Sequence, residues 1–163
     1  MKALGRTWLL ALSALMLISA HSFAQSNPVK LNVAVQEFQP VGASEPEAMA
    51  ITDRLREELV RIGKMTIVDR DKMADILKTQ ADQQAACSGG PANCAVKIGK
   101  ILGVRMMISG KVIKFAKDAW QVSATMVDVE TAQTVKAETV RYRGDVISLT
   151  DKAMPELATK LGG

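Results

Sequence analysis

The first apolar run after position 30 has the period of a β-strand and covers Leu31 to Phe38. Val33 and Val35 fall on one face of such a strand, and Ala34 falls on the other. Because both faces carry apolar side chains, we expect a central strand that is covered on both sides.

A helical period follows Ser44-Glu45-Pro46-Glu47, in which Ser44 and Glu47 can form a capping box. Pro46 suits the first helical turn, where its missing N–H costs nothing. The apolar positions then recur at spacings of three and four: Ala48, Ile51, Leu55, Leu59 and Ile62. This pattern predicts an amphipathic helix that ends at Gly63.

The next segment predicts a short strand over Met65 to Val68 and two further helices. Asp69 or Asp71 can cap the first of these helices, which runs out in Gln83 and Gln84. Residues 87–94 are expected to form a loop. Asn93 can cap the other helix, and Gly103 ends it.

After Gly103 the period changes from helix to strand. Three strands are predicted, over Arg105 to Phe115, Trp120 to Met126 and Thr134 to Tyr142. The connections at 116–119 and 130–133 are short, so the strands should form an antiparallel meander.

A last helix carries Val146, Leu149, Ala153, Leu157 and Leu161 on one stripe. Pro155 should kink or break that helix.

The element order is therefore β-α-β-α-α-β-β-β-α. It predicts the α/β class, as a single domain with helices packed on one mixed sheet. A terminal strand of the meander can expose an edge that invites pairing, so a homo-oligomer is one expectation.

The first 24 residues have the pattern of a secretory signal peptide. Lys2 and Arg6 precede the apolar run 8–18, and Ser22-Phe23-Ala24 supplies the small residues of a cleavage site. We therefore expect residues 1–24 to be removed and residues 25–163 to form a periplasmic domain. No cysteine follows the expected cleavage site, which argues against a lipid anchor, and no transmembrane segment is expected after cleavage.

Charge and composition narrow the classes of function. The whole chain carries 21 basic and 17 acidic residues. Loss of Lys2 and Arg6 leaves 19 and 17, with no basic patch that would indicate nucleic-acid binding. His21 is the one histidine of the chain and leaves with the signal, so imidazole chemistry is not expected. We expect no enzyme activity, no cofactor and no metal.

Cys87 and Cys94 flank a Ser-Gly-Gly-Pro-Ala-Asn segment that lets the chain double back. In an oxidising compartment this spacing predicts a structural disulfide worth about 2.5 kcal/mol. A redox pair or metal site is the alternative, but the motif is not Cys-x-x-Cys, and two sulfurs are too few for a closed zinc site.

The other candidate sites, a phosphate-binding loop and a carboxylate pair, have weaker support in the sequence. Gly103 and Gly110-Lys111 do not have the spacing of a phosphate loop, and Gly110 indicates a strand bulge. Three near pairs of acids are candidates for a carboxylate site: Glu57 and Glu58, Asp69 and Asp71, and Asp128 and Glu130. Nothing else needed for an active site accompanies them.

The order of several motifs resembles the CsgG/HfaB family of envelope proteins, which includes the curli secretion component. The motifs are Val68-Asp69-Arg70 with Met73-Ala74-Asp75-Ile76-Leu77, Ile98 to Val104 leading into Met107 to Val112, and Val122 to Thr131. Ala132 stands where the family has a glycine after the last motif. The resemblance covers nearly all of residues 31–161 and extends to LpoB-type penicillin-binding-protein activators and, more distantly, to the TolB N-terminal domain.

The resemblance implies the family's periplasmic domain without its pore. The connections at 116–119 and 130–133 leave no room for transmembrane hairpins, each strand of which needs about 9–11 residues. The first hypothesis is a CsgG-like periplasmic adaptor or scaffold for outer-membrane assembly or export, such as curli assembly, with outer-membrane association left open. The alternative is an LpoB-like regulator that binds a peptidoglycan synthase. Both predict envelope proteins as partners.

Overall fold

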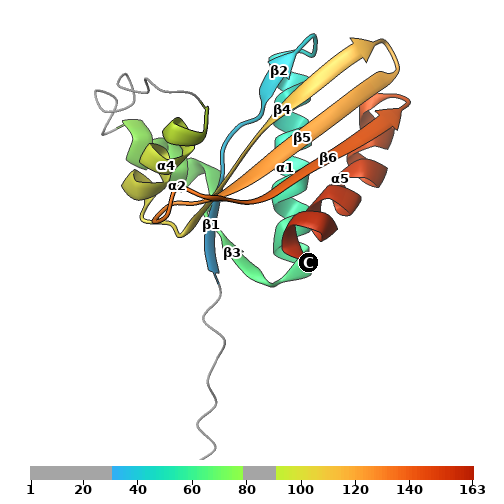
Figure 1. The fold of residues 1–163 in the computed structure, drawn as a ribbon. Helices are drawn as coiled ribbons and strands as arrows, with labels where there is room; N and C mark the ends of the chain where they lie inside the picture. Colours follow the sequence, from blue (N-terminus) through green and yellow to red (C-terminus); the bar gives the residue numbers. More distant parts are fainter. Residues whose placement is uncertain (1–30, 79–90) are drawn as a thin grey trace, which may run out of the picture.

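The computed structural model describes residues 31–78 and 91–163 (Figure 1). The helices are α1 (Glu45–Ile62), α2 (Arg70–Lys78), α4 (Pro91–Leu102) and α5 (Val146–Gly162). The strands are β1 (Leu31–Val35), β2 (Gln39–Val41), β3 (Met65–Ile67), β4 (Met106–Ala116), β5 (Ala119–Asp128) and β6 (Thr134–Arg143). The predicted signal peptide lies outside the described residues, so the cleavage site stays a prediction.

The strands form one mixed sheet in the order β3-β1-β4-β5-β6, and β2 pairs with β4 beyond the end of β1. β1 runs parallel to both β3 and β4, while β4, β5 and β6 form the predicted antiparallel meander. Since β6 pairs with β5 alone among the described strands, it is an edge of the sheet, as expected. The predicted fold class is confirmed.

Helices α1 and α5 pack side by side on one face of the sheet (Figure 1). Between them and the sheet lies the larger core, which draws on Val33 and Val35 from β1, Ile108 from β4 and Leu157 from α5. The alternating buried residues of β5 complete it: Trp120, Val122, Ala124 and Met126. Burial of this apolar area is the main stabilising contribution to the fold.

Helices α2 and α4 cover only part of the opposite face. Their smaller core contains Ala34 from β1, Met107 from β4 and Met73 from α2. Ala34 and Met107 are fully buried, so β1 is covered on both sides as its sequence predicts. The rest of this face, over β4, β5 and β6, carries no helix of the described chain.

The caps of α1 agree with the sequence pattern. The Glu47 backbone N–H donates to Ser44 Oγ at 3.4 Å, and the Ser44 backbone N–H donates to Glu47 Oε2 at 2.8 Å. Gly63 has a φ of 73° and its N–H donates to the Leu59 and Val60 carbonyl oxygens. A glycine accepts this left-handed conformation without steric cost, which is why the helix ends there.

The first strand is shorter than predicted, because the chain leaves the sheet after Val35. Phe38 turns into the core, and its backbone N–H donates to Thr52 Oγ1 at 3.2 Å instead of joining a strand ladder. The chain re-enters the sheet as β2. The predicted strand over Leu31 to Phe38 is therefore interrupted by a side-chain acceptor from α1.

Two local expectations, for Asn93 and for Cys94, were wrong, and of the kink or break expected at Pro155 the break is absent. α4 begins at Pro91, so Asn93 lies within the helix and is not its cap, and Cys94 lies on that helix, outside a loop. Proline suits a first helical turn, which explains the earlier start. α5 continues through Pro155 without a break, because Met154 and Leu157 are fully buried on either side of it.

Gly110 marks no bulge, since the β4–β5 register runs evenly through its pairing with Ala124. A Cβ at this position would lie 2.3 Å from the Ser123 carbonyl oxygen and 2.8 Å from the Phe38 ring. Gly110 therefore provides room for Phe38. The irregularity of β4 lies further on, between Lys114 and Ala116.

Candidate functional site

Alternation along β5 divides the sheet into a buried face and an open one. Gln121, Ser123 and Thr125 point away from α1 and α5 and are half-buried, whereas Val122 and Ala124 between them are buried. The face that carries Gln121, Ser123 and Thr125 continues onto β4 and β6 through their pairing. We call this uncovered surface of β4, β5, β6 and β2 the outer face.

The outer face has an apolar half at β2 and the end of β4. Val41 pairs with Ile113, and Phe115, at the irregularity of β4, lines the same shallow cleft as Arg141 and Arg143. Phe115 is 68% exposed and Val41 is 48% exposed. Exposed apolar side chains that are neighbours on one surface, unlike scattered ones, are typical of an interaction site.

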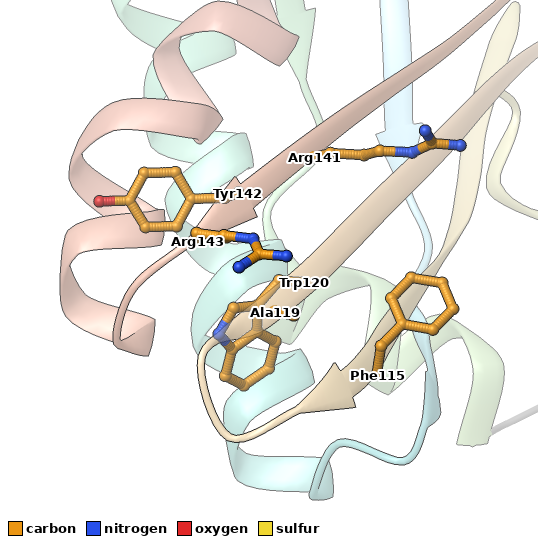
Figure 2. A pocket seen from close by; sticks show the side chains of 6 residues that line it. All are labelled: Phe115, Ala119, Trp120, Arg141, Tyr142 and Arg143. Carbon is orange, nitrogen blue, oxygen red and sulfur yellow. The ribbon is translucent and has the colours of Figure 1, made fainter.

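The other half is basic and comes from β6. Arg141 and Arg143 lie two residues apart, so strand geometry places both on the outer face. Arg141 is opposite Gln121, and its Nε donates to Gln121 Oε1 at 3.1 Å. Figure 2 shows both guanidinium groups reaching over the sheet toward the side of Phe115, around a shallow cleft of about 260 Å³.

The charge on the outer face has one sign. The described strand residues that point to it include Lys111, Arg141 and Arg143 and no acid. Within residues 31–78 and 91–163, none of these three cations forms an ion pair. The face thus offers unneutralised positive charge beside exposed apolar side chains.

The end of the sheet that carries this surface is held from the buried side. Trp120 Nε1 donates to the Gly144 carbonyl oxygen at 2.9 Å, and the Gly144 N–H donates to the Asp118 carbonyl oxygen at 2.8 Å. Lys114 Nζ lies 4.4 Å from the centroid of the Trp120 ring and 2.7 Å from Glu47 Oε1. The hydrogen bond and charge of Lys114, with the N–H of Ser44, lower the pKa of Glu47 to about 2.

Two of the three predicted acidic pairs are parts of helices. Glu57 and Glu58 both lie on α1 and bind Arg54, so they are neutralised within their own helix. Asp69 caps α2, because its Oδ1 accepts from the N–H groups of Asp71 and Lys72.

Asp128 and Glu130 share one cation at the end of β5. Arg105 reaches both carboxylates at 2.7 Å. Asp128 also accepts from the Thr131 and Glu130 N–H groups, and these bonds together with Arg105 lower its pKa. Asp128 is thereby kept ionised as a turn acceptor. The structure brings none of the three pairs to the outer face.

The predicted disulfide cannot be compared with the structure, because Cys87 lies outside the described residues. Cys94 is half-buried in α4. Over the described ranges, no group of three His, Cys, Asp or Glu side chains has the arrangement of a metal site. In the same part of the chain, no helix has both the length and the apolar character needed to cross a membrane.

Sequence reasoning missed the outer face. The available signal was the Arg141-Tyr142-Arg143 alternation, which places both arginines on one side of a strand. What the sequence did not show is that no helix of the described chain covers that side.

The fold and this surface define a class: an α/β domain with α1 and α5 on one face of its mixed sheet and, among the described residues, helices over only part of the other face. The chain belongs to the DUF3280 family, described as "Protein of unknown function (DUF2380)", whose sequence pattern matches residues 31–160. Among curated proteins, none matches the chain significantly.

Several solved structures share the fold. The LpoB C-terminal domain from Escherichia coli is similar with a TM-score of 0.55 and 18% identity, over 70% of this chain and 83% of that one. The PelC dodecamer from Paraburkholderia phytofirmans has a TM-score of 0.54 and 14% identity, over 82% and 86%. TolB from Acinetobacter baumannii has a TM-score of 0.52 and 14% identity, over 81% of this chain and 27% of that one. At these identities the likeness concerns the fold.

Proposed function

We propose that this protein is a non-catalytic regulator of the bacterial envelope that docks on a peptidoglycan synthase. The observation that carries the proposal is the fold likeness to the LpoB C-terminal domain, which extends over most of both chains. The sequence resemblance to LpoB-type penicillin-binding-protein activators points the same way.

Features of the described residues agree with a docking role. In each of the three predicted acidic pairs, at least one carboxylate binds an arginine or caps a helix. The outer face combines exposed apolar and basic side chains on a rigid sheet. The signal-peptide pattern supports a periplasmic location.

A CsgG-like adaptor for outer-membrane assembly or export is the second candidate. The ordered motifs of residues 68–131 favour it, and the PelC fold, solved as a dodecamer, supports a scaffold that assembles from copies. We rank it below the regulator because the LpoB C-terminal domain shares this fold over 70% of this chain and 83% of that one.

The test uses the protein purified from the envelope of cells that export it. It is added to each purified peptidoglycan synthase of the same organism, and glycan polymerisation is followed with fluorescent lipid-linked precursor. We expect at least one synthase to bind and to polymerise several-fold faster. An exported protein of similar size and charge serves as the control. Absence of binding and stimulation with every synthase would remove the regulator proposal and favour the adaptor.

A further inference from the structure

The outer face carries exposed apolar and basic side chains that take no part in the packing of the fold. Phe115 and Val41 contribute nothing to either core, and Arg141 and Arg143 lack a carboxylate partner among the described residues. Exposed aromatic and cationic side chains on one rigid surface are the residue types enriched where proteins bind partners.

We propose that the outer face is the docking site for an acidic segment of a partner protein. Phe115 is its apolar anchor, and Arg141 and Arg143 receive the partner's carboxylates. The inference deepens the proposed function and rests on it, since it names the surface and the chemistry by which this chain would hold a synthase.

Charge complementarity determines the sign of the charge on the partner's segment. Arg141 and Arg143 place two guanidinium groups on the same face, and Lys111 adds a third positive charge. A guanidinium group binds a carboxylate through two parallel N–H···O bonds, which fixes orientation as well as charge. An acidic segment is therefore the complement of the β6 half.

The apolar half favours a protein over an anionic polysaccharide. Val41, Ile113 and Phe115 offer no hydrogen-bonding group to sugar hydroxyls. An aliphatic or aromatic side chain of a protein would instead bury Phe115, which is 68% exposed in the free chain. A large apolar residue beside acids is thus the expected partner motif.

The surface is also preorganised. Phe115, Arg141 and Arg143 stand on paired strands, and the hydrogen bonds of Trp120 and Gly144 hold the adjoining turns. Binding by a surface that is already ordered loses less conformational entropy than binding by a loop.

The first experiment measures binding of the full protein to the synthase that it stimulates. The variants are Arg141→Glu with Arg143→Glu, and Phe115→Ala. The matched control is Lys152→Glu, an exposed charge reversal on α5 behind the sheet. Unchanged circular dichroism establishes that the variants are folded. We expect at least about tenfold higher Kd for each outer-face variant and less than about twofold for the control.

Equal binding of wild type and outer-face variants would overturn the inference and leave the proposed function standing. If no synthase binds the wild type, the proposed function fails, and the surface is tested by itself in living cells. A photo-crosslinking amino acid then replaces Phe115 in one strain and Lys152 in another. The crosslinked partner peptide is identified by mass spectrometry.

The expected adduct forms at position 115 and not at 152, maps to an acidic protein segment, and falls at least about tenfold when Arg141 and Arg143 are reversed. Reversing the mapped acids to lysine in the partner should restore it in the Arg141→Glu, Arg143→Glu background. An adduct with a second copy of this chain, an adduct with polysaccharide, or no adduct at position 115 would each overturn the inference.

Discussion

Ala132 holds a left-handed backbone conformation in the turn between β5 and β6, with a φ of 58°. The Cβ of an L-residue crowds the following carbonyl there, at a cost of about 1–2 kcal/mol. The sequence pointed to this position, because the CsgG/HfaB family, which this chain resembles, has a glycine there. The turn nevertheless closes, since Asp128 Oδ1 accepts from the N–H groups of Glu130 and Thr131.

Ala132→Gly should raise the free energy of unfolding by about 0.5–1 kcal/mol, because relief of the strain exceeds the entropy that glycine adds to the unfolded chain. Urea unfolding followed by Trp120 fluorescence measures it. Ala137→Gly, on β6, is the control and should destabilise. A destabilised Ala132→Gly protein would contradict the assigned turn.

Gly110 has a backbone conformation that any residue can adopt, but no room for a Cβ. A substitution there therefore tests packing alone. Gly110→Ala should cost about 3 kcal/mol or more, because the new methyl group meets the Ser123 carbonyl and the Phe38 ring. Gly103→Ala is the comparison: its φ is 64° with open space around it, so about 1 kcal/mol is expected. If Gly103→Ala proved the more destabilising of the two in urea unfolding, the close packing of Phe38 would be wrong.

At the scale of elements, the start of α1 is tied to the end of β4. Glu47 closes the capping box with Ser44 and also binds Lys114, whose ammonium lies over Trp120. One carboxylate therefore connects a helix terminus to the strand that bears Phe115. The sequence predicted the capping box, but the partner from β4 lies 67 positions further along the chain.

The pKa of Glu47 is about 2 in the folded state against 4.5 for an unperturbed group, so its contribution to stability has a defined pH window. The contribution is fully present above about pH 4.5 and is lost as the pH falls toward 2. Glu47→Gln should cost about 1–2 kcal/mol at pH 7 and little near pH 2. Urea unfolding of both proteins across this range measures the difference.

The control for this experiment is Glu45→Gln, in the same first turn of α1. Glu45 is exposed and makes no side-chain hydrogen bond or ion pair with the described residues. Its substitution should change stability by about 0.5 kcal/mol or less through the helix dipole. A difference between wild type and Glu47→Gln that stays constant with pH would count against the lowered pKa.

At the scale of the whole molecule, the sheet has two unequal cores. Among the described residues, twenty buried ones form the core under α1 and α5, whereas six form the core under α2 and α4. Because local stability follows buried apolar contact, the two helical layers should open at different free energies. The outer face belongs to the strands that the larger core supports.

Native-state amide hydrogen exchange should therefore be faster in α2 and α4 than in α1 and the central strands β4 and β5. We expect protection factors in α2 to be lower by at least about tenfold, which corresponds to about 1.4 kcal/mol. Mass-spectrometric exchange on the full protein resolves this by peptide. Equal protection of α1 and α2 would mean that the two layers unfold as one unit.

Most of the fold was predictable because its signals are local. The period of apolar residues separates helix from strand, and Gly63 and Gly103 end helices by a backbone conformation that glycine adopts easily. The predictions fail where tertiary contacts override the local signal. Thr52 captures the Phe38 N–H and divides the first strand, and burial of Met154 and Leu157 carries α5 through Pro155.

The candidate site was predictable only in part. Asp128 and Glu130 were recognised as a pair, but their role depends on Arg105, which precedes β4 and lies 23 positions before Asp128 in the chain. Arg141 and Arg143 were visible as alternating residues of a strand. Their partners on the outer face, Phe115 and Val41, come from β4 and β2.

The amino-acid sequence was sufficient to specify the order of the described elements except β2, the caps of α1, the covered central strand and the family pattern of residues 31–160, because these depend on residues close together in the chain. Which face of the meander stays open was set by tertiary packing. An alternating strand has two faces, and the one that becomes buried depends on where distant helices pack. Since α1 and α5 take one face and α2 and α4 reach only part of the other, the arginines and Phe115 are left together in solvent.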